Sequence, residues 1–233
     1  MNIGGLLKNS MIDYPGKLSC GIFLTGCNFD CPYCHNPELA RGRTRHTAEL
    51  NPDDIYRFIE GRKGFLDGVV ISGGEPTLQA DLYDLCRDIK AMGYPVKLDT
   101  NGSRPLVIRR LIAEGLVDYI AMDLKTDPVK YATYIQSSCN FSDILASIEI
   151  IMNSAVAYEF RTTFVKPIVT AREIENICRL IEGARVYALQ RFHRSDMLHP
   201  EFFKETNYEY SDAELEQLKA VAEPWVEQCI LRP

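Results

Sequence analysis

Long hydrophobic runs are absent from this sequence of 233 residues, and no stretch is apolar for long enough to cross a membrane. No linker rich in proline, glycine and serine, no internal repeat and no low-complexity tract divides the chain. We therefore expect one domain over residues 1–233. The Met1 end lacks the pattern of a secretory signal, which favours a cytoplasmic location.

An excess of basic residues is also missing. The chain has 26 Lys+Arg against 32 Asp+Glu, which gives a net charge of -6. This balance offers no electrostatic reason to expect nucleic acid as the main partner. With 46% hydrophobic and 25% charged residues, the composition is that of a soluble globular protein with a sizeable core.

Most of the eight cysteines are scattered, at positions that do not form a second cluster: Cys20, Cys86, Cys139, Cys178 and Cys229. Without a secretory signal, this number fits a reducing compartment better than a disulfide framework. Cys20 and Cys178 have apolar neighbours, so we expect them in the core.

Three cysteines do stand together, as Cys27, Cys31 and Cys34. Their spacings of four and three would share one face of a helix, but Pro32 resists a helix interior, so the segment is expected to be a loop. Four-iron clusters usually take four cysteine ligands, so three would leave one iron open to a substrate. The alternative is a zinc site in which His35 is the fourth ligand.

The remaining sequence alternates short strands with helices. Strands are predicted over 19–24, 68–72, 96–99, 119–124, 158–165 and 186–190, and helices over 53–63, 81–92, 105–114, 142–153 and 172–182. Six such units predict a parallel sheet flanked by helices. After Arg191 the pattern ends in irregular, aromatic-rich sequence, until a capping box at Ser211 indicates a further helix.

Several predicted strands carry charged residues on a face that should be buried. Because side chains alternate along a strand, the following are expected to share faces: Lys97 with Asp99, Asp123 with Lys125, and Glu159 with Arg161 and Thr163. A closed barrel fills its interior with apolar side chains, and buried charges are costly unless they are paired. These positions therefore predict a charged ligand inside the fold, or else exposed strand ends and mutual ion pairs.

A glycine pair, Gly73 and Gly74, directly follows the predicted strand over 68–72, and Glu75 comes next. Glycines allow a sharp turn and a close approach of the backbone to a ligand. The carboxyl end of a parallel strand is also where α/β proteins place their sites.

Together these motifs resemble those of the radical S-adenosylmethionine (radical SAM) enzymes, which share the three-cysteine spacing with an aromatic residue at Tyr33 and the Gly-Gly-Glu motif. Asp99-Thr100-Asn101-Gly102 and Met122-Asp123-Leu124-Lys125 are similar to motifs of the branch that activates glycyl radical enzymes. Within it, the similarity is greatest to the anaerobic ribonucleoside-triphosphate reductase activating proteins. It extends from about Gly5 to Phe192.

The resemblance implies a partial (β/α)6 TIM-like barrel, with a core over about 5–192 and a C-terminal extension over 193–233. It implies a 4Fe–4S cluster on Cys27, Cys31 and Cys34. It further implies S-adenosylmethionine bound by Tyr33, Gly73, Gly74, Glu75, Asp99, Asn101, Lys125, Arg161 and His193. In that arrangement the Gly-Gly-Glu motif holds the amino group of the methionine moiety, Lys125 contacts its carboxylate, Arg161 approaches the ribose and His193 the adenine.

The same resemblance suggests a monovalent cation beside the cofactor. In pyruvate formate-lyase activase, residues matching Asp99, Thr100 and Asp123 are associated with such an ion. Here Ala121 could add its backbone carbonyl.

The implied chemistry needs no acidic or basic side chain. A reduced cluster gives one electron to the sulfonium, the products are methionine and a 5′-deoxyadenosyl radical, and that radical takes hydrogen from a glycine of a separate glycyl radical enzyme. The expected partners are that enzyme, an anaerobic ribonucleoside-triphosphate reductase, and a flavodoxin or ferredoxin-type electron donor. The alternatives are a radical SAM enzyme that acts on a small molecule or an RNA base, and a non-catalytic metal or electron-transfer module.

Overall fold

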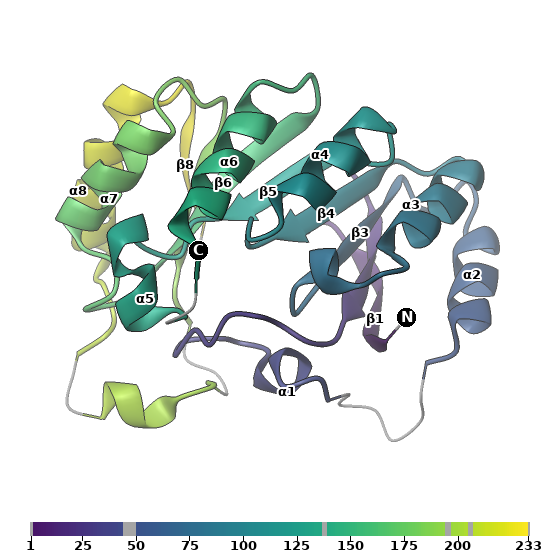
Figure 1. Ribbon diagram of the computed structural model, residues 1–233, viewed down its shortest axis with the longest axis horizontal. Coiled ribbons are helices and arrows are strands. Elements are labelled where there is room, and N and C mark those ends of the chain that lie inside the picture. The colour runs from purple at the N-terminus through teal and green to yellow at the C-terminus, as the bar shows by residue number, and fades with distance from the viewer. Residues whose placement is uncertain (1, 44–49, 137–138, 194–196, 205–206, 233) are drawn as a thin grey trace.

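The protein forms one sheet of eight strands whose spatial order follows the chain, β1 to β8 (Figure 1). The computed structural model describes residues 2–43, 50–136, 139–193, 197–204 and 207–232. β1 (Ile3–Ser10) pairs antiparallel with β2 (Ser19–Leu24). The other neighbours are parallel: β3 (Gly68–Gly73), β4 (Val96–Thr100), β5 (Tyr119–Asp123), β6 (Ala157–Phe164), β7 (Tyr187–Arg191) and β8 (Cys229–Arg232).

The described sheet is not closed, because β1 and β8 each have one strand neighbour. This open arrangement confirms the predicted partial barrel. All six predicted strands are present as β2 to β7, with ends that differ from the prediction by at most one residue.

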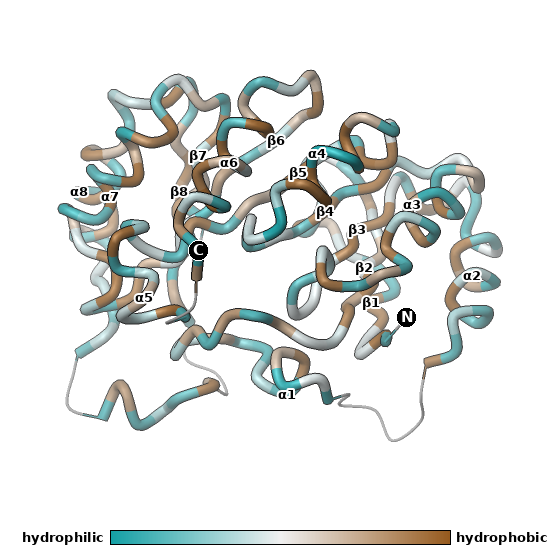
Figure 2. The backbone as a smooth tube through the Cα atoms, viewed as in Figure 1, coloured by the Kyte–Doolittle hydropathy of each residue, from teal (hydrophilic) through white to brown (hydrophobic). Residues whose placement is uncertain are grey.

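Helices cover one face of the sheet (Figure 1). They are α2 (Pro52–Glu60), α3 (Leu82–Ala91), α4 (Pro105–Ala113), α6 (Phe141–Met152), α7 (Ala171–Leu180) and α8 (Asp212–Ala222). The short helices α1 (Pro37–Ala40) and α5 (Tyr131–Tyr134) lie in the connections that follow β2 and β5. Figure 2 shows hydrophobic and hydrophilic residues alternating along α2, α3 and α4, as expected where one side of a helix packs on a sheet. The predicted capping box is present at α8, where Ser211 and Glu214 satisfy each other's backbone amides.

Single turns of 3-10 helix join several of these elements. They are η1 (Pro76–Leu78), η2 (Pro128–Lys130), η3 (Pro200–Phe203) and η4 (Glu223–Trp225). Nowhere in the described ranges is a helix both long and apolar enough to span a membrane.

The two faces of the sheet differ in chemistry. On β4, Val96 and Leu98 are completely buried apolar residues, whereas the alternate positions are Lys97 and Asp99. The helix-covered face is thus the hydrophobic one, and the opposite face carries charge. This agrees with the sequence-based expectation that charged residues share one face.

The tail holds a strand that the sequence did not predict. β8 follows α8 and pairs with β7, and Arg232 on it donates to the buried carboxylate of Glu159 at 2.9 and 2.6 Å. The sequence analysis expected a helix from Ser211 and named no strand after it. Four half-exposed residues give a weak strand signal, and the register of β8 comes from its backbone pairing with β7.

Candidate functional site

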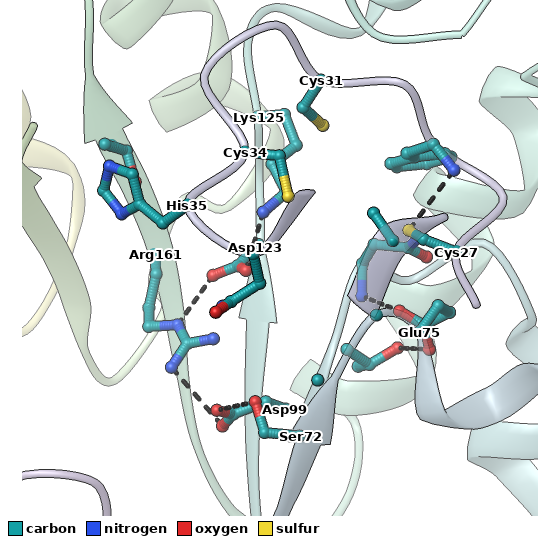
Figure 3. Close-up of a pocket in the computed structure, with 18 of the residues that line it drawn as sticks. Cys27, Cys31, Cys34, His35, Ser72, Glu75, Asp99, Asp123, Lys125 and Arg161 are labelled. Carbon is teal, nitrogen blue, oxygen red and sulfur yellow. Dashed lines mark hydrogen bonds and ion pairs between the residues drawn. The ribbon is translucent and has the colours of Figure 1, made fainter. Parts of the chain in front are cut away.

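A cavity of about 390 Å³ lies between the cysteine loop and the charged face of the sheet (Figure 3). It brings together nearly all of the predicted site residues: Cys27, Cys31, Tyr33, Cys34, Gly73, Gly74, Glu75, Asp99, Thr100, Asn101, Asp123, Lys125 and Arg161. Because these residues come from the ends of β3, β4, β5 and β6 and from the loop after β2, the fold alone assembles the site.

The cysteine loop, residues 25–36, is fixed from several sides. The amide of Cys34 donates to the carbonyl of Cys31 at 3.0 Å, which closes a turn around Pro32. Asp30 donates its amide to Ile135 at 2.9 Å, and the carbonyl of Pro32 accepts from the amide of His199 at 3.1 Å. The segment is therefore a loop held in place by these hydrogen bonds and not a helix, as Pro32 indicated from the sequence.

The thiols of this loop are partly or fully shielded from water. Burial raises the pKa of Cys27 to about 11 and that of Cys31 to about 12, although the charge of Lys125 opposes both shifts. Thiolates are the form that binds iron, so cluster binding here must displace protons. The ammonium of Lys125 favours that step.

The position of His35 bears on the zinc alternative. Its ring stacks on Phe192, with centroids 5.0 Å apart, and it lies near Arg161, well away from Cys27 (Figure 3). Across the described residues, no three Cys, His, Asp or Glu side chains converge closely enough to hold one metal ion. Zinc needs such convergence, whereas a four-iron cluster offers each thiolate a different iron. The separated thiols lining one cavity therefore fit a cluster better.

Tyr33 links the loop to the sheet. Its hydroxyl donates to the carbonyl of Lys125 at 3.2 Å, and the amide of Lys125 donates to the Tyr131 hydroxyl at 2.9 Å. The Tyr33 ring meets Phe192 edge to face, with centroids 6.3 Å apart. Tyr33 thus holds the end of β5 and the cysteine loop at a fixed separation.

Gly73 and Gly74 allow the backbone after β3 to pass very close to the end of β2. Gly73 has φ +121, and a Cβ there would lie 2.2 Å from the carbonyl oxygen of Leu24. At Gly74 a Cβ would lie 2.1 Å from the carbonyl oxygen of Gly26. No side chain fits at either position, so the predicted need for glycine is explained by backbone packing beside the cavity.

Glu75 lines the cavity, and its carboxylate is hydrogen-bonded within the chain. It is 1% exposed, and its carboxylate accepts hydrogen bonds from the Thr77 amide at 3.1 Å, the Thr100 hydroxyl at 2.8 Å and the Asn101 amide at 2.6 Å. The Thr77 hydroxyl is a fourth donor. This carboxylate therefore joins the turn after β3 to the turn after β4, and both line the cavity.

Five charged side chains form a continuous row along the sheet, which we call the charge ladder: Lys97, Asp99, Arg161, Asp123 and Lys125. Arg161 stands in the middle, with Nε 2.7 Å from Asp123 Oδ1 and a terminal nitrogen 3.4 Å from Asp99 Oδ1 (Figure 3). Lys125 Nζ donates to Asp123 Oδ2 at 2.8 Å, and Lys97 pairs with Asp99. The expected mutual ion pairs are present, and Asp99, Asp123, Lys125 and Arg161 also line the cavity, whereas the charged ligand stays a prediction.

The charge ladder shifts the acidity of its members. Burial alone would raise the pKa of Asp123, but the charges of Arg161 and Lys125 hold it well below the usual value. Arg161 and Lys97 lower the pKa of Asp99 in the same way against its burial. Burial disfavours the charge of Lys125, yet Asp123 raises its pKa well above normal. Asp99, Asp123 and Lys125 are thus ionised at neutral pH.

Asn101 faces the cysteine loop. Its side-chain oxygen accepts from the Ser103 amide at 3.0 Å, which orients its nitrogen toward Asn28 Oδ1 at 3.0 Å and Cys27 Sγ at 3.9 Å. The amide of Phe29 also donates to this sulfur, at 3.4 Å. Two donors thus point at one of the predicted cluster ligands.

One predicted residue lies outside the cavity: His193 is exposed and does not line it. Conversely, the sequence analysis did not assign a site role to Asp13, Asn36, Ser72, Thr163 and Gln190, which do. Strand alternation could have found some of them, since Thr163 lies two residues after Arg161 on β6.

Three thiols and a row of paired ions lie at the carboxyl ends of the strands of an open α/β barrel. This arrangement is typical of one class of proteins, the enzymes that work with an iron–sulfur cluster at the mouth of a partial barrel. Residues 22–181 match the Radical SAM superfamily, and the chain belongs to this family. The family uses a 4Fe–4S cluster and S-adenosylmethionine, which confirms the predicted cofactors and the enzyme class.

Two relatives are provisionally named glycyl-radical enzyme activating enzymes, both of Methanocaldococcus jannaschii. The first is 36% identical over 99% of this chain and 95% of its own length. The second is 30% identical over 77% of this chain and 68% of its own length. Among solved structures, a radical SAM methyltransferase from Sphaerobacter thermophilus matches with a TM-score of 0.70 at 14% identity, over 94% of this chain and 67% of that one. That likeness supports the fold.

Proposed function

We propose that this protein activates a glycyl radical enzyme, and that its partner is an anaerobic ribonucleoside-triphosphate reductase. The observation that carries the proposal is the cavity itself, which faces three thiols on one side and the charge ladder on the other. The names of the two relatives support the choice of partner class. The partner itself is proposed from the resemblance of the motifs after β4 and β5.

The residues present fit both cofactors. Cys27, Cys31 and Cys34 would hold the cluster, and its three-thiolate set leaves one iron for the amino and carboxylate groups of S-adenosylmethionine. When bound, the two together supply a one-electron reduction that breaks the bond between sulfur and the 5′ carbon, and the resulting carbon radical accepts a hydrogen atom from the substrate. A flavodoxin or ferredoxin-type donor in a reducing cytoplasm would provide the electron.

The side chains of this chain then bind and orient. Lys125 carries a permanent positive charge that suits the methionine carboxylate, and Arg161 offers donors for ribose hydroxyls. Tyr33 and the aromatic group around Phe192 keep water from one side of the loop. No side chain is required to move a proton.

We take the substrate to be a protein. The described sheet does not close between β1 and β8, so a narrow backbone loop that carries a glycine could enter from that side. Glycine suits this chemistry because its Cα radical is stabilised between two peptide groups and has no side chain to block approach.

The experiment mixes reduced, reconstituted protein with S-adenosylmethionine and a candidate partner that is deuterated at its glycine α-carbon. We expect a glycyl radical in electron paramagnetic resonance spectra and deuterium in the 5′-deoxyadenosine product. Deuterium transfer from a nucleoside or an RNA base, with none from any glycyl radical enzyme of the same organism, would contradict the proposal.

A further inference from the structure

Lys97 stands at the end of the charge ladder and does not line the cavity, and the resemblance assigns it neither to S-adenosylmethionine nor to a cation. Its side chain is 1% exposed, and its ammonium contacts the carboxylate of Asp99 and lies 6.0 Å from the centroid of the Tyr119 ring. A buried ammonium is costly unless a carboxylate or an aromatic face replaces the lost water. Both are present here, so the fold has a specific environment for this positive charge.

Every carboxylate oxygen of the ladder already has a donor. Asp99 Oδ1 meets Lys97 and Arg161, and Asp99 Oδ2 accepts from the Ser72 hydroxyl at 3.0 Å. Asp123 Oδ1 accepts from Arg161 and Asp123 Oδ2 from Lys125.

Thr100 is engaged as well, because its hydroxyl oxygen accepts from the Gly102 amide at 3.1 Å while its hydrogen is donated to Glu75 at 2.8 Å. The oxygens that could have coordinated a free cation are therefore turned toward donors. Three positive side chains also surround the two aspartates, and their repulsion disfavours a fourth positive charge at the same place.

We infer that Lys97 is the resident counter-ion of Asp99, and that this protein binds S-adenosylmethionine without a free sodium or potassium ion. Lys97 is a positioning residue, which acts through Asp99 on Arg161. A tethered ammonium is present in every molecule, whereas a free ion must first be bound from solution. The inference rests on the proposed placement of S-adenosylmethionine in the cavity.

The first test measures the affinity of the reconstituted holoenzyme for S-adenosylmethionine by calorimetry in sodium, potassium and tetramethylammonium chloride at equal ionic strength. We expect the same affinity in all three salts. Lys97→Met keeps the length of the side chain but removes the charge, so its affinity should fall by about tenfold in tetramethylammonium and recover in sodium or potassium.

Ser72→Ala is the matched control, because it removes a contact to Asp99 without removing a charge. Its affinity should change equally in all salts. If Lys97 has a merely structural role, Lys97→Met should lose affinity for S-adenosylmethionine equally in all three salts, because neither sodium nor potassium would restore it. That result would overturn the inference. So would a wild-type affinity that rises in potassium or sodium over tetramethylammonium, a comparison that needs no variant to fold.

The second test detects the ion directly and does not depend on S-adenosylmethionine. Thallium(I), used as a potassium substitute in nuclear magnetic resonance, should bind Lys97→Met and be displaced by potassium, while the wild type holds none at this site. Thallium bound by the wild type and lost in Asp99→Asn would overturn the inference. If S-adenosylmethionine binds in no salt, the proposed site fails, and the thallium result still decides whether Lys97 replaces a free ion.

Discussion

Replacing Glu75 by alanine separates a structural role from a ligand-binding one. The wild-type carboxylate is buried and accepts from four donors, on Thr77, Thr100 and Asn101. A buried donor left without a partner costs about 1 kcal/mol or more, so the variant should lose roughly 4 kcal/mol of stability, less whatever water can restore. That is a large share of the 5–15 kcal/mol, roughly, that holds a typical domain together.

Urea unfolding followed by circular dichroism would measure this loss. Glu75→Gln should be intermediate, because its oxygen can still accept while its amide nitrogen cannot accept from Asn101. Glu60→Ala on the exposed side of α2 is the control and should stay within about 0.5 kcal/mol of the wild type. If Glu75→Ala is as stable as the wild type but no longer binds S-adenosylmethionine, the carboxylate is a ligand and our reading of its four hydrogen bonds is wrong.

Three further predictions concern the thiols and the charge ladder. Alanine at any one of the clustered cysteines should abolish the iron–sulfur absorption of anaerobically reconstituted protein, whereas alanine at the completely buried Cys178 should not; stoichiometric zinc without that absorption in the wild type would refute the cluster. Lys125→Ala and Arg161→Ala should each weaken S-adenosylmethionine binding by about 2 kcal/mol in calorimetry with iron content unchanged, and unchanged affinity in both would remove them from the site. The folded pKa of Asp99 lies below its unfolded value, so its contribution to stability is complete above about pH 4 and is lost as the pH falls further. The urea midpoint of Asp99→Asn should therefore depend less on pH across that range than the midpoint of the wild type. Equal pH dependence in the two proteins would count against the pairing.

Much of the fold could be predicted from sequence because its signals are local. Each of β2 to β7 is a short apolar or alternating run, and the helices α2, α3, α4, α6 and α7 between these strands each show a helical period. The clustering of Asp99, Asp123 and Arg161 also followed from alternation, since parallel strands bring equivalent positions to one edge.

What the sequence could not give depends on contacts between distant residues. The motif predicts that Glu75 binds a ligand. Only the structure shows that its carboxylate accepts hydrogen bonds from Thr100 and Asn101, on the turn after β4. The strand β8 likewise depends on its pairing with β7, which is distant in the sequence. Ion pairing of Lys97 and Asp99 was one of the alternatives that the sequence suggested. The burial of the Lys97 side chain could not be predicted, because it depends on the whole sheet.

The strand order of this protein has a consequence for its synthesis. Since each strand from β2 to β7 pairs with the one made just before it, the sheet can grow in step with translation. The cysteine loop differs, because Pro32 and Asp30 bond to His199, and Asp30 and His199 are 169 residues apart. The loop thus reaches its final form only when nearly the whole chain has left the ribosome.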